Sequence, residues 1–141
     1  MLKGFKNKHK FNIIFFSSDV NHCKLSMVNA TPSFRQDALD FINRTQPGGT
    51  TNIYDALQFA FKDPEVQAIY FLTDGIPTAG QETNIREILR SVRNEWNEDE
   101  RVEINTTALL TGGDFSSEER QARRFMRRMA RQNDGIFRII K

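Results

Sequence analysis

The first hydrophobic segment of the chain predicts an antiparallel hairpin. Residues 11–18, FNIIFFSS, form a nearly continuous apolar run that is rich in β-forming residues and long enough only for a strand. Residues 19–21 then give a turn, and residues 22–27 alternate between apolar and polar positions as a half-buried strand does. Because the connection is too short for a parallel crossover, the two strands are expected to pair antiparallel.

Helix and strand patterns alternate along the rest of the chain. Thr31 and Pro32 mark the start of a helix that ends at the break QPGG, residues 46–49. Apolar residues at helical spacing predict three further helices, and short apolar runs predict three strands. The helices are expected at 52–61, 84–96 and 117–132, and the strands at 68–72, 102–110 and 136–140. This order predicts an α/β domain with a largely parallel sheet and right-handed crossovers.

In the segments 11–18 and 68–72, apolar residues occur at the positions that point to either face of a strand. Strands of this kind are typical of a sheet interior, where both faces are covered. We therefore expect residues 68–72 to form a central strand, with Asp74 at its carboxyl end.

The composition indicates a single globular domain. The 141 residues are 38% hydrophobic and 27% charged, with a formal net charge of +2. Residues 1–10 carry four lysines without periodicity, so we interpret them as a basic lead-in and place the domain at residues 11–141. The N-terminus has no apolar stretch typical of a signal peptide, and no run reaches the ~20 apolar residues of a membrane helix. The compartment stays open, with a cytoplasmic location as the default.

The sequence offers little material for catalysis. Cys23 is the only cysteine, which excludes an internal disulfide and a Cys-based zinc site. The two histidines are His9 and His22, and His22 adjoins Cys23 on one predicted strand, so their side chains should point to opposite faces. We therefore predict that the chain is not an enzyme.

Two loops are candidates for a binding site. In open α/β sheets, ligands bind outside the carboxyl ends of the strands. The loops GGTTN, residues 48–52, and TDGIPT, residues 73–78, offer hydroxyl groups and one carboxylate there. Oxygen donors suit a hard cation such as Mg²⁺, and the glycines before Thr51 would let its backbone approach an ion closely.

The order of these motifs resembles the von Willebrand factor type A (vWA) domain. FNIIFFSSDV, GGTTNIYDAL and IYFLTDGIPTAG occur in family order, and the resemblance covers nearly the whole chain from residue 11 onward. It implies a Rossmann-like, three-layer α/β fold with a mostly parallel sheet and an antiparallel edge hairpin. In that family a metal-ion-dependent adhesion site (MIDAS) lies at the apex. A D-x-S-x-S loop, a threonine and the aspartate of a T-D-G loop bind the ion there, and a partner's carboxylate typically completes the octahedron.

The resemblance implies two metal ligands in this chain. Thr51 matches the threonine because it stands directly before the second helix, with Thr50 as the less favoured choice, and Asp74 matches the aspartate. The D-x-S-x-S loop has no counterpart, because neither Asp19 nor Asp114 is followed by serines at the required spacing. Since Mg²⁺ demands near-ideal octahedral geometry, we expect this partial site to bind it weakly.

The family's first strand and first helix also have no counterpart. In the family's strand order that strand lies between the segments 11–18 and 68–72, so its absence would leave apolar strand edges that invite self-association. If no other segment lies between these two strands, we expect them to pair directly and parallel in a five-stranded sheet. An uncovered apolar patch should accompany the missing helix.

The helix 117–132 supports an alternative function. It carries six arginines, which are Arg120, Arg123, Arg124, Arg127, Arg128 and Arg131. These would contact phosphates in an anion or nucleic-acid binder. However, Glu118 and Glu119 open the same helix and no aromatic stacking platform accompanies it, so we favour a solvated face with partial ion pairing and consider nucleic acid the less favoured partner.

The leading hypothesis is a non-enzymatic, adhesion-type interaction module that binds a protein partner through the apex of the domain. The expected contact is a carboxylate of the partner. The alternatives are anion or nucleic-acid binding by the helix 117–132, and a truncated product with no independent function. Phosphate binding would weaken steeply with salt, which separates the first alternative from the leading hypothesis.

Overall fold

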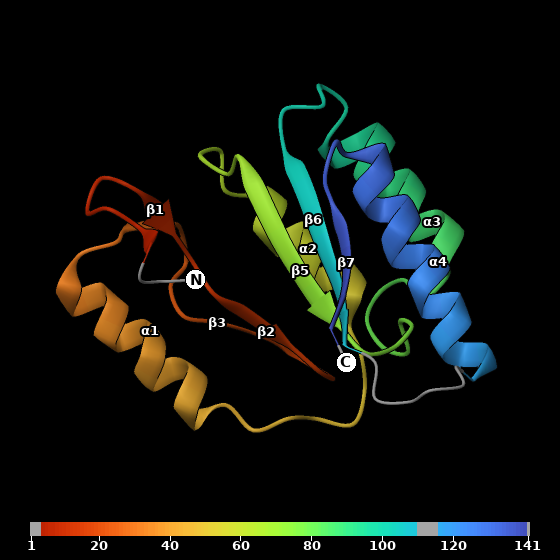
Figure 1. Cartoon of the computed structure of the whole chain (residues 1–141), viewed down its shortest axis with the longest axis horizontal. Coiled ribbons are helices and arrows are strands. Elements are labelled where there is room, and N and C mark those ends of the chain that lie inside the picture. The colour runs from red at the N-terminus through yellow and green to blue at the C-terminus, as the bar shows by residue number, and fades with distance from the viewer. Residues whose placement is uncertain (1–3, 110–115, 141) are drawn as a thin grey trace.

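The computed structural model describes residues 4–109 and 116–140 (Figure 1). Its seven strands form three sheets. These are the antiparallel pair β1 (Lys10–Phe11) and β4 (Val28–Asn29), the antiparallel hairpin β2 (Ile14–Phe16) and β3 (Val20–His22), and the parallel sheet β5 (Ala68–Thr73), β6 (Glu103–Leu109) and β7 (Phe137–Ile140). The helices are α1 (Pro32–Arg44), α2 (Ile53–Phe61), α3 (Ile85–Ser91) and α4 (Ser117–Gln132). The predicted α/β class, with a parallel sheet and an antiparallel hairpin, is confirmed.

Polar side chains cap the first turns of α1, α2 and α4. Thr31 Oγ1 accepts a hydrogen bond from Phe34 N at 3.2 Å, and Asn52 Oδ1 accepts one from Asp55 N, also at 3.2 Å. Ser116 forms a capping box with Glu119 at the start of α4. The predicted helix 84–96 is α3 followed by a π-helical turn, η2 (Val92–Trp96). The predicted strand end at Leu110 and the loop around Asp114 lie outside the described residues.

The predicted strand 11–18 is wrong in its extent. Asn12 divides it into β1 and β2, because its side chain donates to Lys24 O at 2.8 Å and accepts from the backbone N–H groups of Ile13 and Lys24. Asparagine side chains that bond the local backbone compete with strand pairing. The hairpin therefore turns at residues 17–19 and β3 begins at Val20, earlier than the predicted strand 22–27.

Two expectations about residues 68–72 are also wrong. β5 lies at one edge of the parallel sheet and not at its centre, and no ladder joins it to β2, so the five-stranded sheet does not form among the described residues. The hairpin meets the sheet through side chains instead, with the rings of Phe16 and Phe71 5.6 Å apart. Within residues 4–109 and 116–140, both β5 and β2 thus have a strand partner on one side only.

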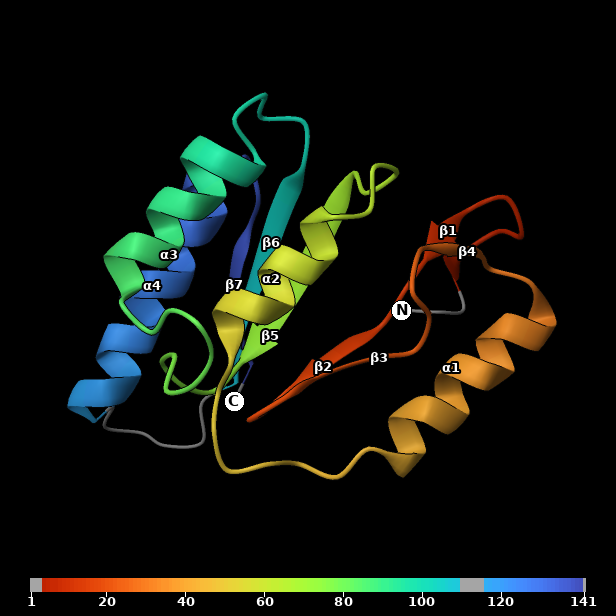
Figure 2. The same cartoon turned by 180° about the vertical axis from the view of Figure 1, so that it is seen from behind.

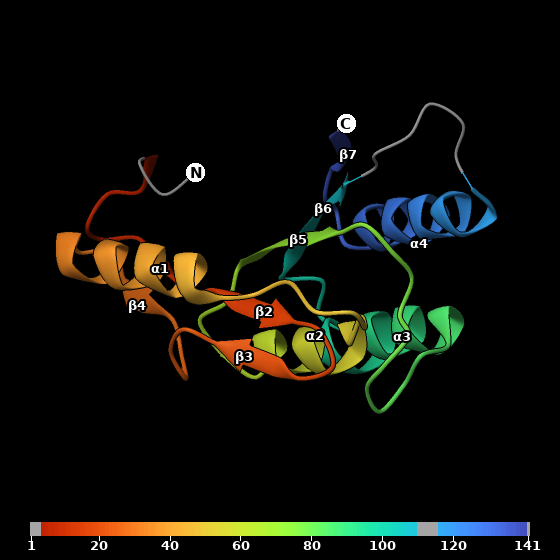
Figure 3. The ribbon, with the colours of Figure 1, turned by 90° about the horizontal axis from the view of Figure 1, so that it is seen from below.

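The main core lies on one face of the parallel sheet. Phe71 of β5 and Ile104 of β6 pack there with residues of α2, α3 and α4 such as Leu57, Leu89 and Met126. Figure 2 shows α2 in front of β5 and α3 in front of α4, and Figure 3 shows the hairpin beside α2. A second, smaller cluster joins β1 to α1, and Phe5, from the segment interpreted as a lead-in, stacks on Phe11.

The opposite face of the parallel sheet exposes apolar side chains. Tyr70 is 58% exposed, Leu72 45% and Ile140 55%. These residues alternate along β5 and β7 with buried or half-buried ones, as expected for strands covered on one face only. An edge strand with an apolar, uncovered face is a ready partner for another copy of the chain.

We expect the chain to self-associate through this face. Replacing both Tyr70 and Leu72 by threonine keeps β-forming residues while removing apolar surface, so the dimer dissociation constant from sedimentation equilibrium should rise at least about tenfold. Leu25→Thr, at a loop position that is 81% exposed, is the control and should change it little. A wild-type chain that stays monomeric at high micromolar concentration would contradict the prediction.

Candidate functional site

Three chain segments meet at the carboxyl end of β5. They are the hairpin tip at residues 17–19, the loop 48–52 and the loop 73–80. Ser18 Oγ lies 2.8 Å from Thr50 Oγ1, and Asn52 N donates to Ser17 O at 2.9 Å. Thr51 N donates to Thr78 Oγ1 at 2.9 Å. These bonds fix the three segments against one another.

Asn52 is the buried centre of this arrangement. It is only 4% exposed, and its Nδ2 donates to Asp55 Oδ2 at 2.8 Å and to Ser18 O at 3.3 Å. Gly80 has a φ of +101°, and a methyl group built on it would lie 2.0 Å from Asn52 Oδ1. Only glycine therefore allows the loop 73–80 to pass so close to the start of α2.

The two predicted metal ligands lie on neighbouring loops. Thr51 is half-buried and Asp74 is exposed. A methyl group built on Gly75 would lie 4.0 Å from Thr51 Oγ1, so the Thr51 hydroxyl adjoins the residue next to Asp74. The structure brings the two loops together as expected from their positions. Their role as ligands remains a prediction.

The donors described at this edge fall short of a complete cation cage. Among the described residues, no three His, Cys, Asp or Glu side chains could together hold one metal ion. Thr51 and Asp74 supply two oxygens, and the Ser18 and Thr50 hydroxyls already bond each other. Mg²⁺ takes six ligands in near-ideal octahedral geometry, so these side chains alone do not fit the ion.

Sequence reasoning missed the residues that organise the loops. Ser18 directly follows an apolar strand, and the rule that ligand loops follow strand ends could have found it. Thr78 lies in the predicted loop 73–78, but its hydrogen bond with Thr51 depends on the path of the loop, and so does the contact of Gly80 with Asn52.

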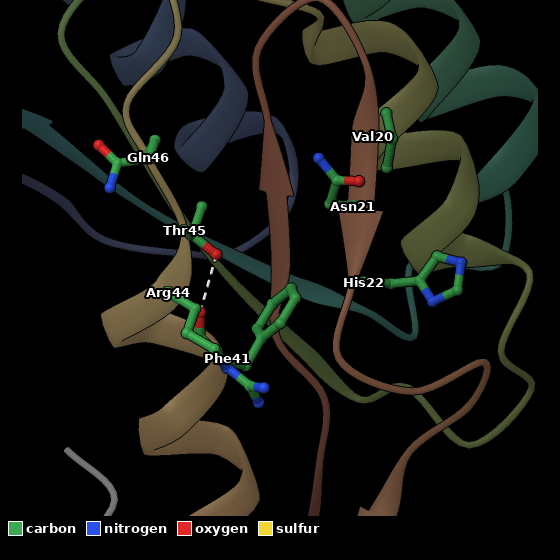
Figure 4. Close-up of a pocket in the computed structure, with 7 residues that line it drawn as sticks. All are labelled: Val20, Asn21, His22, Phe41, Arg44, Thr45 and Gln46. Atoms are coloured by element: carbon green, nitrogen blue, oxygen red, sulfur yellow. Dashed lines mark hydrogen bonds between the residues drawn. The ribbon is translucent and has the colours of Figure 1, made fainter.

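A hollow of about 460 Å³ lies beside the hairpin, between β3 and the end of α1 (Figure 4). Seven residues line it: Val20, Asn21, His22, Phe41, Arg44, Thr45 and Gln46. In Figure 4 the ring of His22 points away from Arg44, toward α2, where it stacks on Phe59 at 4.5 Å. The hollow therefore offers one cation and neutral polar groups, and no paired acid and base.

The thiol of Cys23 is a poor nucleophile. Desolvation by burial, with a smaller contribution from Asp37, raises its pKa, while Lys24 and Arg44 act in the opposite direction. A raised pKa keeps the thiol protonated at neutral pH, and the thiolate is the reactive form.

Among the described residues, no helix is both long and apolar enough to cross a membrane.

These features define a class of protein: an α/β domain with an antiparallel hairpin and oxygen-rich loops at the carboxyl end of its sheet. The sequence profile of the von Willebrand factor type A domain matches residues 1–139. The chain belongs to the vWA domain family.

Two relatives illustrate the match. Human von Willebrand factor A domain-containing protein 3B is 31% identical over 118 residues, which cover 78% of this chain and 9% of the relative. Mouse inter alpha-trypsin inhibitor, heavy chain 4, is 31% identical over 152 aligned residues, covering 99% of this chain and 15% of the relative. The chain thus spans a small part of the length of these relatives.

Solved structures show the same fold. The pilus adhesin SpaC from Lactobacillus rhamnosus GG superposes with a TM-score of 0.67 at 13% identity, over 94% of this chain and 23% of the adhesin. Proximal thread matrix protein 1 from the mussel byssus gives a TM-score of 0.63 at 16% identity, over 98% of this chain and 33% of that protein.

Proposed function

We propose that this domain is a non-enzymatic, adhesion-type module that binds a protein partner through the loops at the carboxyl end of β5. The convergence of the hairpin tip with the loops 48–52 and 73–80 carries this proposal, because it forms one polar surface from three segments. Membership of the vWA family supports it, since a pilus adhesin has the same fold. Loops held at the end of a rigid sheet are common binding surfaces.

Thr51 and Asp74 are, in this proposal, the remaining ligands of an incomplete MIDAS. The sequence has no D-x-S-x-S loop to complete it. The free edges of β2 and β5 support the view that the family's first strand is missing between them, because among the described residues each strand pairs on one side only. A partner's carboxylate would then supply a large share of the interaction with any bound cation.

The incomplete site predicts weak Mg²⁺ binding. Isothermal titration calorimetry on the chain should give a dissociation constant no tighter than about 1 mM, because two protein oxygens replace too little of the ion's water shell. Asp74→Asn should abolish the residual heat, whereas Asp40→Asn, on the exposed side of α1, should leave it unchanged. A micromolar constant would show that other residues complete the site.

Chemical-shift mapping tests the binding surface directly. We expect a short peptide with one aspartate, added with about 10 mM Mg²⁺, to shift the amide signals of Thr51, Gly75 and Thr78. The same peptide with asparagine should leave them in place. Shifts confined to another surface, or none at millimolar peptide, would overturn the proposed function.

A further inference from the structure

Four arginines form a stripe along the exposed side of α4, separate from the loops at the end of β5. Arg124, Arg127, Arg128 and Arg131 occupy positions i, i+3, i+4 and i+7 of the helix, and all are exposed. Residues at these spacings lie on one side of a helix, so the stripe is about 10 Å long at 1.5 Å per residue. Figure 1 shows α4 at the outer edge of the domain, with its far side facing solvent.

The stripe has no carboxylate partner in the part of the chain that the structure describes. Among the described residues, no carboxylate lies within 4.0 Å of these four guanidinium groups, although Arg90 pairs with Glu87 at 2.6 Å and Arg101 with Asp99 at 3.0 Å. These four arginines therefore belong to the expected solvated face, and the partial ion pairing expected for the helix does not extend to them. The reason is local: within α4, the residues three or four positions from Arg124 and Arg128 are arginines or neutral residues, and like charges at these spacings repel.

The backbone beneath the stripe is rigid. The buried side of α4, including Phe125, Met126 and Met129, is part of the main core. The capping box at Ser116 fixes the first turn. The Arg127 guanidinium lies over the ring of Phe137, 5.3 Å from its centre, which restricts that side chain. The backbone positions of the four arginines are thus fixed before any partner arrives, which lowers the entropic cost of binding.

We propose that this stripe docks an acidic segment of a partner protein. Guanidinium groups bind carboxylates through two parallel hydrogen bonds, which makes arginine better suited to this contact than lysine. An acidic segment also removes the repulsion within the helix. A nucleic acid fits less well, because the chain has a net charge of only +2, with 18 acidic residues, and an extended polyanion would meet those as well.

Fluorescence anisotropy with a labelled peptide of twelve glutamates tests the proposal. Arg124→Gln with Arg128→Gln should weaken binding at least about tenfold, since each change removes charge-assisted hydrogen bonds. Arg86→Gln with Arg93→Gln removes the same charge from exposed positions on α3 and η2. That control should change affinity by less than about twofold.

Two further measurements keep the result interpretable. The thermal melting curve of the Arg124→Gln/Arg128→Gln variant should match or exceed that of the wild type, because repulsion is relieved, so lost binding cannot reflect unfolding. Single-stranded and duplex DNA of twelve phosphates per strand are the competing probes. Equal weakening by the two double variants, tighter binding of either DNA than of the peptide, or no peptide binding at high micromolar concentration would each overturn the proposal.

Discussion

Replacing Gly135 by alanine is expected to destabilise the domain by about 3 kcal/mol, the upper part of the usual range for overpacking. A methyl group built on Gly135 would lie 1.8 Å from the carbonyl oxygen of Ile104 and 2.4 Å from its carbon. Both atoms belong to the backbone of β6, so no side-chain rotation can relieve the clash. The turn between α4 and β7 would have to move away from β6, breaking the bond from Ile104 N to Asn133 O.

Gly49→Ala is the control for this substitution. A methyl group there meets no atom within 4 Å, so the free energy of unfolding should change by no more than about 0.5 kcal/mol. Urea denaturation of both variants measures the difference. Equal stabilities would show that the turn between α4 and β7 adjusts more freely than its packing indicates.

The sequence predicted the helices well because their signals are local. Thr31 marked the start of α1, and α2 and α4 begin within one residue of the starts predicted at residues 52 and 117. Apolar residues at helical spacing identified the buried side of α4. A helix satisfies its own backbone hydrogen bonds, so its extent depends little on distant parts of the chain.

The strands were harder to predict because their partners are distant in sequence. Asn12 bonds the backbone of Lys24 and divides the predicted strand 11–18, an effect that depends on the path of the hairpin. The apolar pattern of β5 predicted a central strand that is covered on both faces. Among the described residues, however, only one face is covered, so Tyr70 and Leu72 are exposed. The apolar pattern shows that a strand is suited to burial on both faces. It does not show whether a neighbouring element covers each face.

The candidate site likewise combines features that local sequence signals predict with features that depend on contacts between distant segments. The rule that ligands bind outside the carboxyl ends of the strands was enough to predict that Thr51 and Asp74 lie at one edge of the sheet. The hydrogen bond from Thr51 to Thr78 and the close approach of Gly80 to Asn52 arise from tertiary packing. The positive face of α4 was visible in the sequence, but its lack of carboxylate neighbours in the described structure required coordinates.

Removing the side chain of Asn97 is expected to cost about 3 kcal/mol of stability. Asn97 is 2% exposed and connects the end of η2 to the residue before β6 and to the residue after α4. Its Nδ2 donates to Val102 O and to Asn133 Oδ1, each at 2.8 Å, and its Oδ1 accepts from Val102 N at 3.0 Å. Asn97→Ala leaves three buried polar groups without these partners, and each unsatisfied group costs about 1–3 kcal/mol.

A double-mutant cycle separates the hydrogen bonds from the loss of packing. Asn133→Ala removes the amide that accepts from Asn97, so the two substitutions should be less costly together than the sum of their separate effects. Asn94→Ala, an exposed position one turn earlier, is the control and should stay within about 0.5 kcal/mol of the wild type. Hydrogen exchange at the Val102 amide gives a local readout: it should accelerate in Asn97→Ala and stay slow in Asn94→Ala. Additive effects with unchanged exchange would mean that packing alone holds α4, and with it the arginine stripe, against the sheet.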